Sequence, residues 1–212
     1  MPLLLLHGSR GIRLKLRFGS LSVLWISGFI LLGIPLAEGF LGYILDWGQM
    51  SYRGVTAMIN ILVTLFPVYM SSCLPESIWR SCNDIISRIF VLHFSLGILI
   101  GGFISVHPYV SHCYSSSNPL FNSSSSIVPF FPLPHKDIFV SMVIFIGSHN
   151  YIYVSVDILG NSDNQVNANP VATPNHTLPE RYSSLVHNSP RAFPKKRLGL
   201  IAVILLMMLL LM

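Results

Sequence analysis

The chain has 212 residues, of which 52% are apolar and 10% charged, and its mean hydropathy is +0.63. This balance excludes an ordinary soluble domain and indicates a membrane protein in contact with the lipid bilayer. The formal net charge of +5 does not indicate a nucleic-acid partner, because the 13 Lys and Arg residues lie singly or in short clusters beside apolar runs. Basic residues in that pattern are typical of anchors at the membrane surface.

Apolar runs are the main organising feature along the chain. The first of them, near residue 1, places its charges after the apolar residues, whereas a secretory signal places them before, so we expect no cleavable signal. A helix needs about twenty apolar residues to cross a bilayer. Four stretches approach this length, and the fourth is too short for a full crossing: residues 21–45, 85–107, 138–159 and 198–212.

The connections between these stretches differ in character. Residues 55–70 are apolar but short and contain Pro67, which favours an interfacial helical hairpin over a crossing. Residues 108–136 are rich in Ser and Pro, and residues 160–197 hold many of the remaining polar side chains. We therefore expect long loops in both places.

Two histidines, His93 and His107, lie in an apolar stretch without Asp, Glu, Lys or Arg between residues 89 and 107. Polar rings inside a membrane indicate function. At fourteen positions apart they lie within about 40° of the same helix face and about 21 Å apart along the axis. Each is placed to hold one of two cofactors near opposite membrane surfaces, and haem is the natural candidate because imidazole is a strong axial ligand. The alternative is two histidines hydrogen-bonded to neighbouring helices.

The stretch "SRIFVLHFSLGILIGGFISVH" with the following "SHCYSSSNPL" resembles the fourth transmembrane helix and next loop of mitochondrial cytochrome b. "GYILDWGQMSYRG" is similar to that family's GYVLPWGQMSFWG segment, and "LHGSRG" resembles the end of its second helix. Later segments match in order: "KDIF", "ILGNSDNQVNANP", "TPNHTLPERY" and "RAFPKKRLGLIA". The resemblance covers roughly the middle half of the family.

The resemblance implies an all-α fold, namely a partial cytochrome b-type transmembrane helical bundle with about four spanning helices and an interfacial helical hairpin. Residues 1–159 would form part of the haem-binding N-terminal region: the end of the second helix and the third to fifth helices. Residues 160–212 would begin the C-terminal region, with the loop around "PERY" and a truncated helix.

Cytochrome b carries two b-type haems, each held by one histidine from the second helix and one from the fourth. By position, His93 would ligate the haem iron near the quinol-oxidising side. His7 and His107 would ligate the other iron near the quinone-reducing side, and Arg10 would face a haem propionate. The partner expected for His93 falls before Met1, so this haem would lack its second ligand in the chain.

Quinone-binding positions also follow from the resemblance. His112, Ser116 and Asp137 match positions at the quinone-reducing site, with Lys136 beside them. Glu180 and Tyr182, in "PERY", match the family's PEWY motif, whose glutamate accepts a proton from quinol. Parity of the spans puts Trp47, Arg53 and Glu180 at one membrane surface and His7, His112 and Asp137 at the other.

The implied function is that of the cytochrome b component of ubiquinol:cytochrome c oxidoreductase in the respiratory chain of the mitochondrial inner membrane. That component passes electrons from ubiquinol through the haems to ubiquinone with proton translocation. Its partners are the Rieske iron–sulfur subunit and cytochrome c1, and the family is dimeric. We expect no activity from the isolated chain. The alternatives are a non-catalytic, degenerate membrane polypeptide that binds no haem, and an unrelated transporter with a histidine-lined proton path.

Five positions depart from the family pattern. Asp46 and Gly97 stand where the family has proline, Arg53 and Arg181 where it has tryptophan, and Glu38 where it has threonine. Charged groups inside a membrane cost several kcal/mol unless they are paired or hydrated. A C-to-U edited transcript would restore both tryptophans; otherwise the departures indicate a partial or decaying copy.

Overall fold

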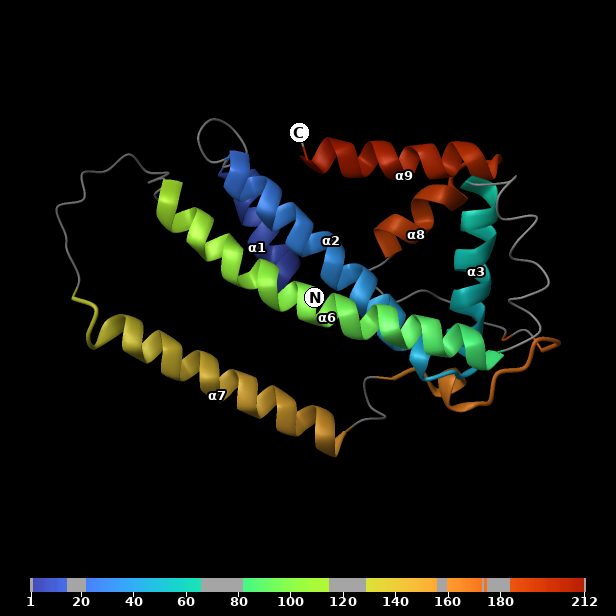
Figure 1. Cartoon of the computed structure of the whole chain (residues 1–212), viewed down its shortest axis with the longest axis horizontal. Helices are drawn as coiled ribbons and strands as arrows, with labels where there is room; N and C mark the ends of the chain where they lie inside the picture. The colour runs from blue at the N-terminus through green and yellow to red at the C-terminus, as the bar shows by residue number, and fades with distance from the viewer. Residues whose placement is uncertain are drawn as a thin grey trace.

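The structure, a computed structural model, describes residues 2–14, 22–65, 82–114, 129–155, 160–172, 174 and 184–211. Helices account for most of these residues, and an isolated bridge between Gly48 and Asn167 is the nearest approach to a β-strand within them. The elements in chain order (Figure 1) are α1 (Pro2–Arg13), α2 (Ser22–Leu45), α3 (Gln49–Leu65), α6 (Cys82–Tyr114), α7 (Leu133–Val154), the 3₁₀ helix η2 (Ser162–Gln165), α8 (Ser184–Arg191) and α9 (Lys196–Leu211).

Three of the described helices are long and apolar enough to cross a membrane: α2, α6 over Ile85–Cys113, and α7. The expected all-helical membrane fold is thereby confirmed. The helix over the fourth apolar stretch, α9, has 16 residues. At the helical rise it covers about 24 Å, which is less than the hydrocarbon core.

The bounds of the helices differ from the expected ones where prolines occur. α6 continues through Pro108 to Tyr114, so the loop expected from residue 108 begins later. A helix buried in a membrane tolerates an internal proline because only one backbone hydrogen bond is lost. α7 begins at Leu133 rather than at 138, with Pro134 in its first turn, where the missing N–H has no partner to lose.

The stretch expected as an interfacial hairpin is a single helix over its described part. α3 begins at Gln49, six positions before the expected start, and ends at Leu65. Residues 66–81, which would hold the second arm, lie outside the described residues. α3 packs on α2 and α6 through a small apolar core made of Leu41, Ile44, Val55 and Ile89.

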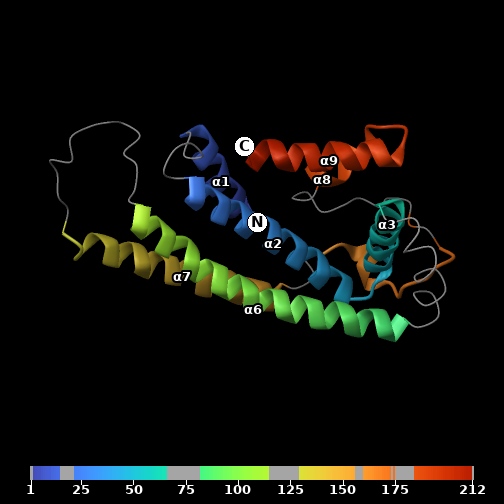
Figure 2. The ribbon, with the colours of Figure 1, turned by 45° about the horizontal axis from the view of Figure 1, so that its top comes forward.

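The antiparallel pair α2–α6 forms the axis of the molecule, and the two helices run side by side in both ribbon views (Figures 1 and 2). One stripe of α6 faces α2, with steps that alternate between four and three residues as expected for a helix seam. The stripe is half-buried or buried and consists of Ile89, His93, Leu96, Ile100, Phe103, His107 and Val110. Both intramembrane histidines therefore face α2.

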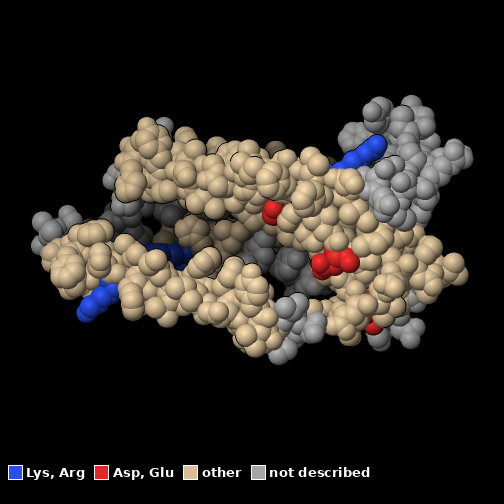
Figure 3. Space-filling view, turned by 60° about the horizontal axis from the view of Figure 1, so that its bottom comes forward, with Lys and Arg blue, Asp and Glu red and all other residues tan. Residues whose placement is uncertain are grey.

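α7 contrasts with this pair because its side chains, apart from Pro134, are exposed on every side. The helix is apolar enough to cross a membrane, with Lys136 and Asp137 in its first turns. A helix that is apolar all round belongs in lipid or inside a larger bundle. Uncharged residues cover most of the face in Figure 3, with Lys, Arg, Asp and Glu as isolated groups.

A polar contact joins the start of α3 to the segment around η2. The Gly48–Asn167 bridge brings the two segments together, and a Cβ at Gly48 would overlap the Asn164 carbonyl. The Asn164 side-chain oxygen accepts from the Ser51 backbone N–H at 3.0 Å and from its hydroxyl at 2.9 Å. Residues 47–51 and 161–172 are thus held together at the end of α2 by hydrogen bonds of the buried Gln49 and Ser51.

Candidate functional site

The ring of His107 lies directly against the backbone of α2 at Gly28. A Cβ at Gly28 would be 3.1 Å from Cε1 of that ring, so the glycine leaves the space that the imidazole uses. Nδ1 of His107 is 2.7 Å from the Ser27 hydroxyl, which donates its proton to the Leu24 carbonyl at 2.8 Å. The Ser27 oxygen therefore accepts from Nδ1–H. This leaves the lone pair of His107 on Nε2, the form in which a histidine binds a metal.

A second histidine, His7 on α1, faces the same ring. The centroids of the His7 and His107 rings are 6.4 Å apart and their planes make an angle of 82°. A metal–nitrogen bond to imidazole is about 2 Å long, so two imidazoles on opposite sides of one metal have centroids about 6 Å apart. The spacing between these two rings thus matches that of an axial ligand pair.

Further protein ligands do not surround this pair. Across the described residues, no three His, Cys, Asp or Glu side chains gather in one place. A metal bound between His7 and His107 would therefore need its remaining ligands from elsewhere, as a haem iron obtains them from the porphyrin. Two facing imidazoles over a glycine fit a haem better than they fit a bare metal ion.

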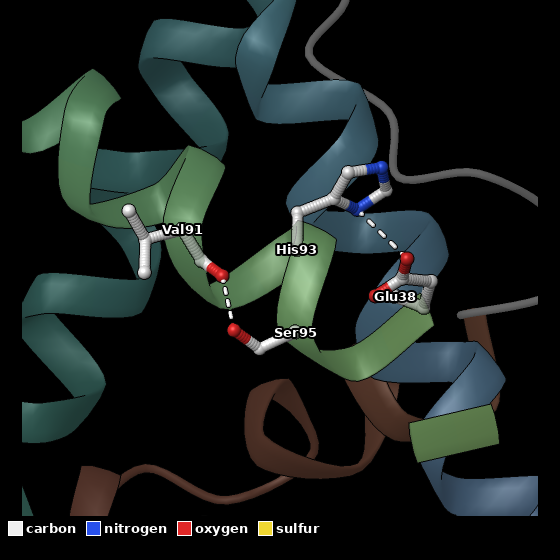
Figure 4. A network of polar contacts seen from close by, with 4 residues as sticks. All are labelled: Glu38, Val91, His93 and Ser95. Carbon is white, nitrogen blue, oxygen red and sulfur yellow. Dashed lines mark hydrogen bonds and ion pairs between the residues drawn. The ribbon is translucent and has the colours of Figure 1, made fainter. Parts of the chain in front are cut away.

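At the other end of the α2–α6 helix pair, His93 lies against α2 at Gly42. A Cβ at Gly42 would be only 2.9 Å from Cε1 of the His93 ring. Nδ1 of His93 lies 3.2 Å from Oε1 of Glu38, which comes from α2 one turn before Gly42 (Figure 4). Both histidines thus meet a glycine on α2 and present Nδ1 to an oxygen of that helix.

The two glycines repeat the spacing of the two histidines. Gly28 and Gly42 are fourteen positions apart on α2, as His93 and His107 are on α6. Since the helices are antiparallel, Gly28 meets His107 and Gly42 meets His93. A shared spacing of this kind is visible in the sequence and would have identified the glycines, whereas the Ser27 and Glu38 contacts carry no sequence signal of their own.

The remaining expected site residues lie at helix ends. Arg10 is exposed on α1, one turn after His7. His112 is exposed in the last turn of α6, and Lys136 and Asp137 are exposed near the start of α7, at the same end of the molecule in Figure 1. Three expected residues fall outside the described part of the chain: Ser116, Glu180 and Tyr182.

Trp47 and Arg53 lie at the opposite end of the α2–α6 pair from His7 and His112, as the parity of the spans predicts. Trp47 has a backbone φ of 49° at the turn between α2 and α3. Arg53 donates to the carbonyls of Pro170 and Ala172. Backbone oxygens of the segment 161–172 thus accept the hydrogen bonds of the Arg53 guanidinium.

The fold and this site define a class: a multi-spanning helical membrane protein whose central helix pair holds two histidines over glycines. The family model described as "Cytochrome b(N-terminal)/b6/petB" matches residues 19–174, and that described as "Cytochrome b(C-terminal)/b6/petD" matches residues 167–212. The chain belongs to the cytochrome b family.

Individual relatives agree with this assignment. Cytochrome b of Acrochordus granulatus is 36% identical over 98% of this chain and 56% of its own length. Cytochrome b of Phytophthora megasperma is 35% identical over 85% of this chain and 48% of its own length. A solved structure titled "Hyperthermophilic respiratory Complex III" shares the fold, with a TM-score of 0.82 at 24% identity over 99% of this chain and 58% of that chain. The chain spans about half the length of the curated relatives it matches.

Proposed function

We propose that the chain is a haem-carrying cytochrome b component that passes electrons between quinol and quinone in a respiratory membrane. The observation that carries this proposal is the facing pair His7 and His107, with ring centroids 6.4 Å apart. The hydrogen bond from His107 to Ser27 supports it, because it leaves Nε2 free to bind iron. Haem b, when bound, supplies reversible one-electron chemistry.

His7 and His107 would be the two axial ligands of one haem, with Arg10 facing a propionate. His93 would ligate the second haem above Gly42. The glycines let the groups between α2 and α6 approach the backbone closely, which a Cβ at either position would prevent. The second ligand of the His93 haem would be the histidine that the family carries earlier in its second helix, upstream of the segment that "LHGSRG" resembles.

The quinone chemistry belongs to the same proposal. His112, Ser116 and Asp137 would contact quinone at the reducing site, where a histidine and a carboxylate can supply and take up protons. Glu180 and Tyr182 would act on quinol at the opposite surface. The partners would be the Rieske iron–sulfur subunit and cytochrome c1, in a dimeric complex of the mitochondrial inner membrane. Residues 1–159 would form the haem-binding part and residues 160–212 the start of the C-terminal part.

The test is a reduced-minus-oxidised optical spectrum of the full chain, purified in detergent from membranes of haem-replete cells. We expect a b-type α-band, and we expect His107→Ala to remove the part of it due to the His7–His107 pair. His149→Ala is the matched control, because His149 is a histidine of the apolar helix α7, away from the α2–α6 seam. The control should keep the full band.

Absence of the band from well-folded, membrane-inserted chain would overturn the proposal and support the non-catalytic polypeptide. Survival of the complete band in the His107→Ala variant would show that the ligand assignment is wrong. Quinol oxidation is not expected from the isolated chain even when the band is present, because the electron path needs both haems and the other subunits.

A further inference from the structure

Glu38 lies inside the membrane-spanning length of α2, with a side chain that is 19% exposed, and its Oε1 is 3.2 Å from Nδ1 of His93 (Figure 4). The two atoms lie within ion-pair distance, but the contact does not have the geometry of a hydrogen bond. Oε2 of Glu38 and Nδ1 of His93 are both buried without a hydrogen-bond partner among the described residues. Each of the two groups is therefore the polar partner available to the other.

Gly97 lies beside the carboxylate. A Cβ at Gly97 would lie 3.4 Å from Oε1 of Glu38, so the oxygen sits close over the backbone of α6 one turn after His93. Glu38 and Gly97 are both positions where the chain departs from the family pattern, and the structure brings them together. The carboxylate thus has a seat between His93 and Gly97 that belongs to this chain.

A carboxylate on the outer nitrogen of a metal-binding histidine has two effects. It holds the proton on Nδ1, which leaves the lone pair on Nε2, and it fixes the orientation of the ring. It also makes the imidazole a stronger donor to the metal, which stabilises the oxidised metal relative to the reduced one. At the other end of the pair, Ser27 offers His107 a neutral hydroxyl instead.

We propose that Glu38 is the positioning residue of His93, and that its carboxylate keeps Nε2 of this histidine available and electron-rich for a haem iron. This inference rests on the proposed function for the identity of the group that His93 binds. It makes the two ends of the α2–α6 pair chemically unequal: a carboxyl partner at His93 and a hydroxyl partner at His107.

The first test needs no haem. The full chain is labelled with ¹⁵N-histidine in detergent micelles, and the His93 signals are identified by their loss in His93→Gln. We expect His93 to carry its proton on Nδ1, and Glu38→Leu, which removes the acceptor, to shift the proton toward Nε2. Asp46→Asn, an exposed acid just beyond α2, is the control and should leave His93 unchanged. An unchanged His93 in the Glu38→Leu variant overturns the proposal.

The second test measures the reduction potential of haem at His93 in the full chain. In a His107→Ala background, with imidazole added as the second axial ligand, the bound haem is titrated potentiometrically. Glu38→Gln keeps the size of the side chain and removes its charge. We expect it to shift the equilibrium at least about tenfold toward the reduced haem, which is 59 mV for a one-electron couple. An equal potential in both proteins overturns the electronic role of Glu38.

The two tests separate the two proposals. A chain that takes up no haem, although the His93 proton follows Glu38, overturns the proposed function while supporting the positioning of His93. A chain that binds haem, but whose His93 proton and potential ignore Glu38, supports the proposed function and overturns this inference.

Discussion

At each end of the α2–α6 pair a histidine ring packs against a glycine of α2, which we call its seat, but the other neighbours of the two rings differ. His107 lies over Gly28, faces His7 and donates to a hydroxyl, whereas His93 lies over Gly42 and meets the carboxylate of Glu38. The seat comes from the helix register alone. The neighbours decide what each ring can bind and how strongly, so two equivalent positions on one helix need not have equivalent chemistry.

Replacing His7 with alanine should leave the His107 end with one histidine, as at the His93 end. With one imidazole left at His107, we expect complete loss of the low-spin signal of the haem between α1 and α6, because bis-histidine ligation produces that state. Electron paramagnetic resonance of the oxidised chain would measure it. His135→Ala is the control, because His135 is an exposed histidine at the start of α7. Persistence of the low-spin signal would exclude His7 as a ligand.

Removing the hydroxyl partner should weaken the His107 end selectively. Ser27→Ala takes away the acceptor at 2.7 Å from Nδ1, and the loss of such a partner typically costs 10–100-fold in metal affinity. Haem transfer to apomyoglobin would follow the faster release. Ser105→Ala, whose exposed hydroxyl donates to the Gly101 carbonyl within α6, should release haem at the original rate. Equal release from the two variants would show that Ser27 does not support the ligand.

Substituting alanine for Gly28 and for Gly42 compares the packing at the two ends directly. A Cβ would approach the His93 ring to 2.9 Å at Gly42 and the His107 ring to 3.1 Å at Gly28, so Gly42→Ala should disturb the packing more. Overpacking of this kind costs about 1–3 kcal/mol. Thermal unfolding in detergent would rank the variants, with Gly33→Ala as control, since a Cβ there meets nothing within 4 Å. Equal melting temperatures for all three variants would contradict the prediction that the histidine rings need the space at Gly28 and Gly42.

A smaller effect is expected from the polar contact beyond the His93 end. The buried Ser51 hydroxyl lies 2.7 Å from the Tyr43 carbonyl and 2.9 Å from Asn164 Oδ1. Ser51→Ala should lower the free energy of unfolding by about 1 kcal/mol, because one buried hydrogen-bonding group is lost. Limited proteolysis around residues 161–172 would detect the opening. Ser95→Ala, whose exposed hydroxyl donates to the Val91 carbonyl, should leave cleavage unchanged.

Much of the fold follows from local features of the sequence. Apolar length identifies α2, α6 and α7, and a spacing of fourteen residues puts His93 and His107 on one face of α6. Helix ends were less predictable: Pro108 suggests a stop, yet α6 continues to Tyr114 because a single proline removes one hydrogen bond and the rest of the helix remains.

The partners of the histidines could not be read from the sequence in the same way. Glu38 and His93 are far apart along the chain, and they meet only because α2 and α6 pack antiparallel in one register. Glu38 stands out in the sequence as a charge in an apolar span, which marks it as unusual but does not name the group it contacts. The resemblance to cytochrome b placed the histidines; only the three-dimensional packing placed Ser27 and Glu38.

The matched spacing of Gly28 and Gly42 with His107 and His93 limits changes in the length of these helices more than changes in their composition. Deleting one residue between the two glycines would turn one of them by about 100° and move it 1.5 Å relative to the other. Only one histidine would then keep its seat. Apolar exchanges between the glycines, in contrast, leave both seats in place, so this segment should tolerate drift in sequence and reject insertions and deletions.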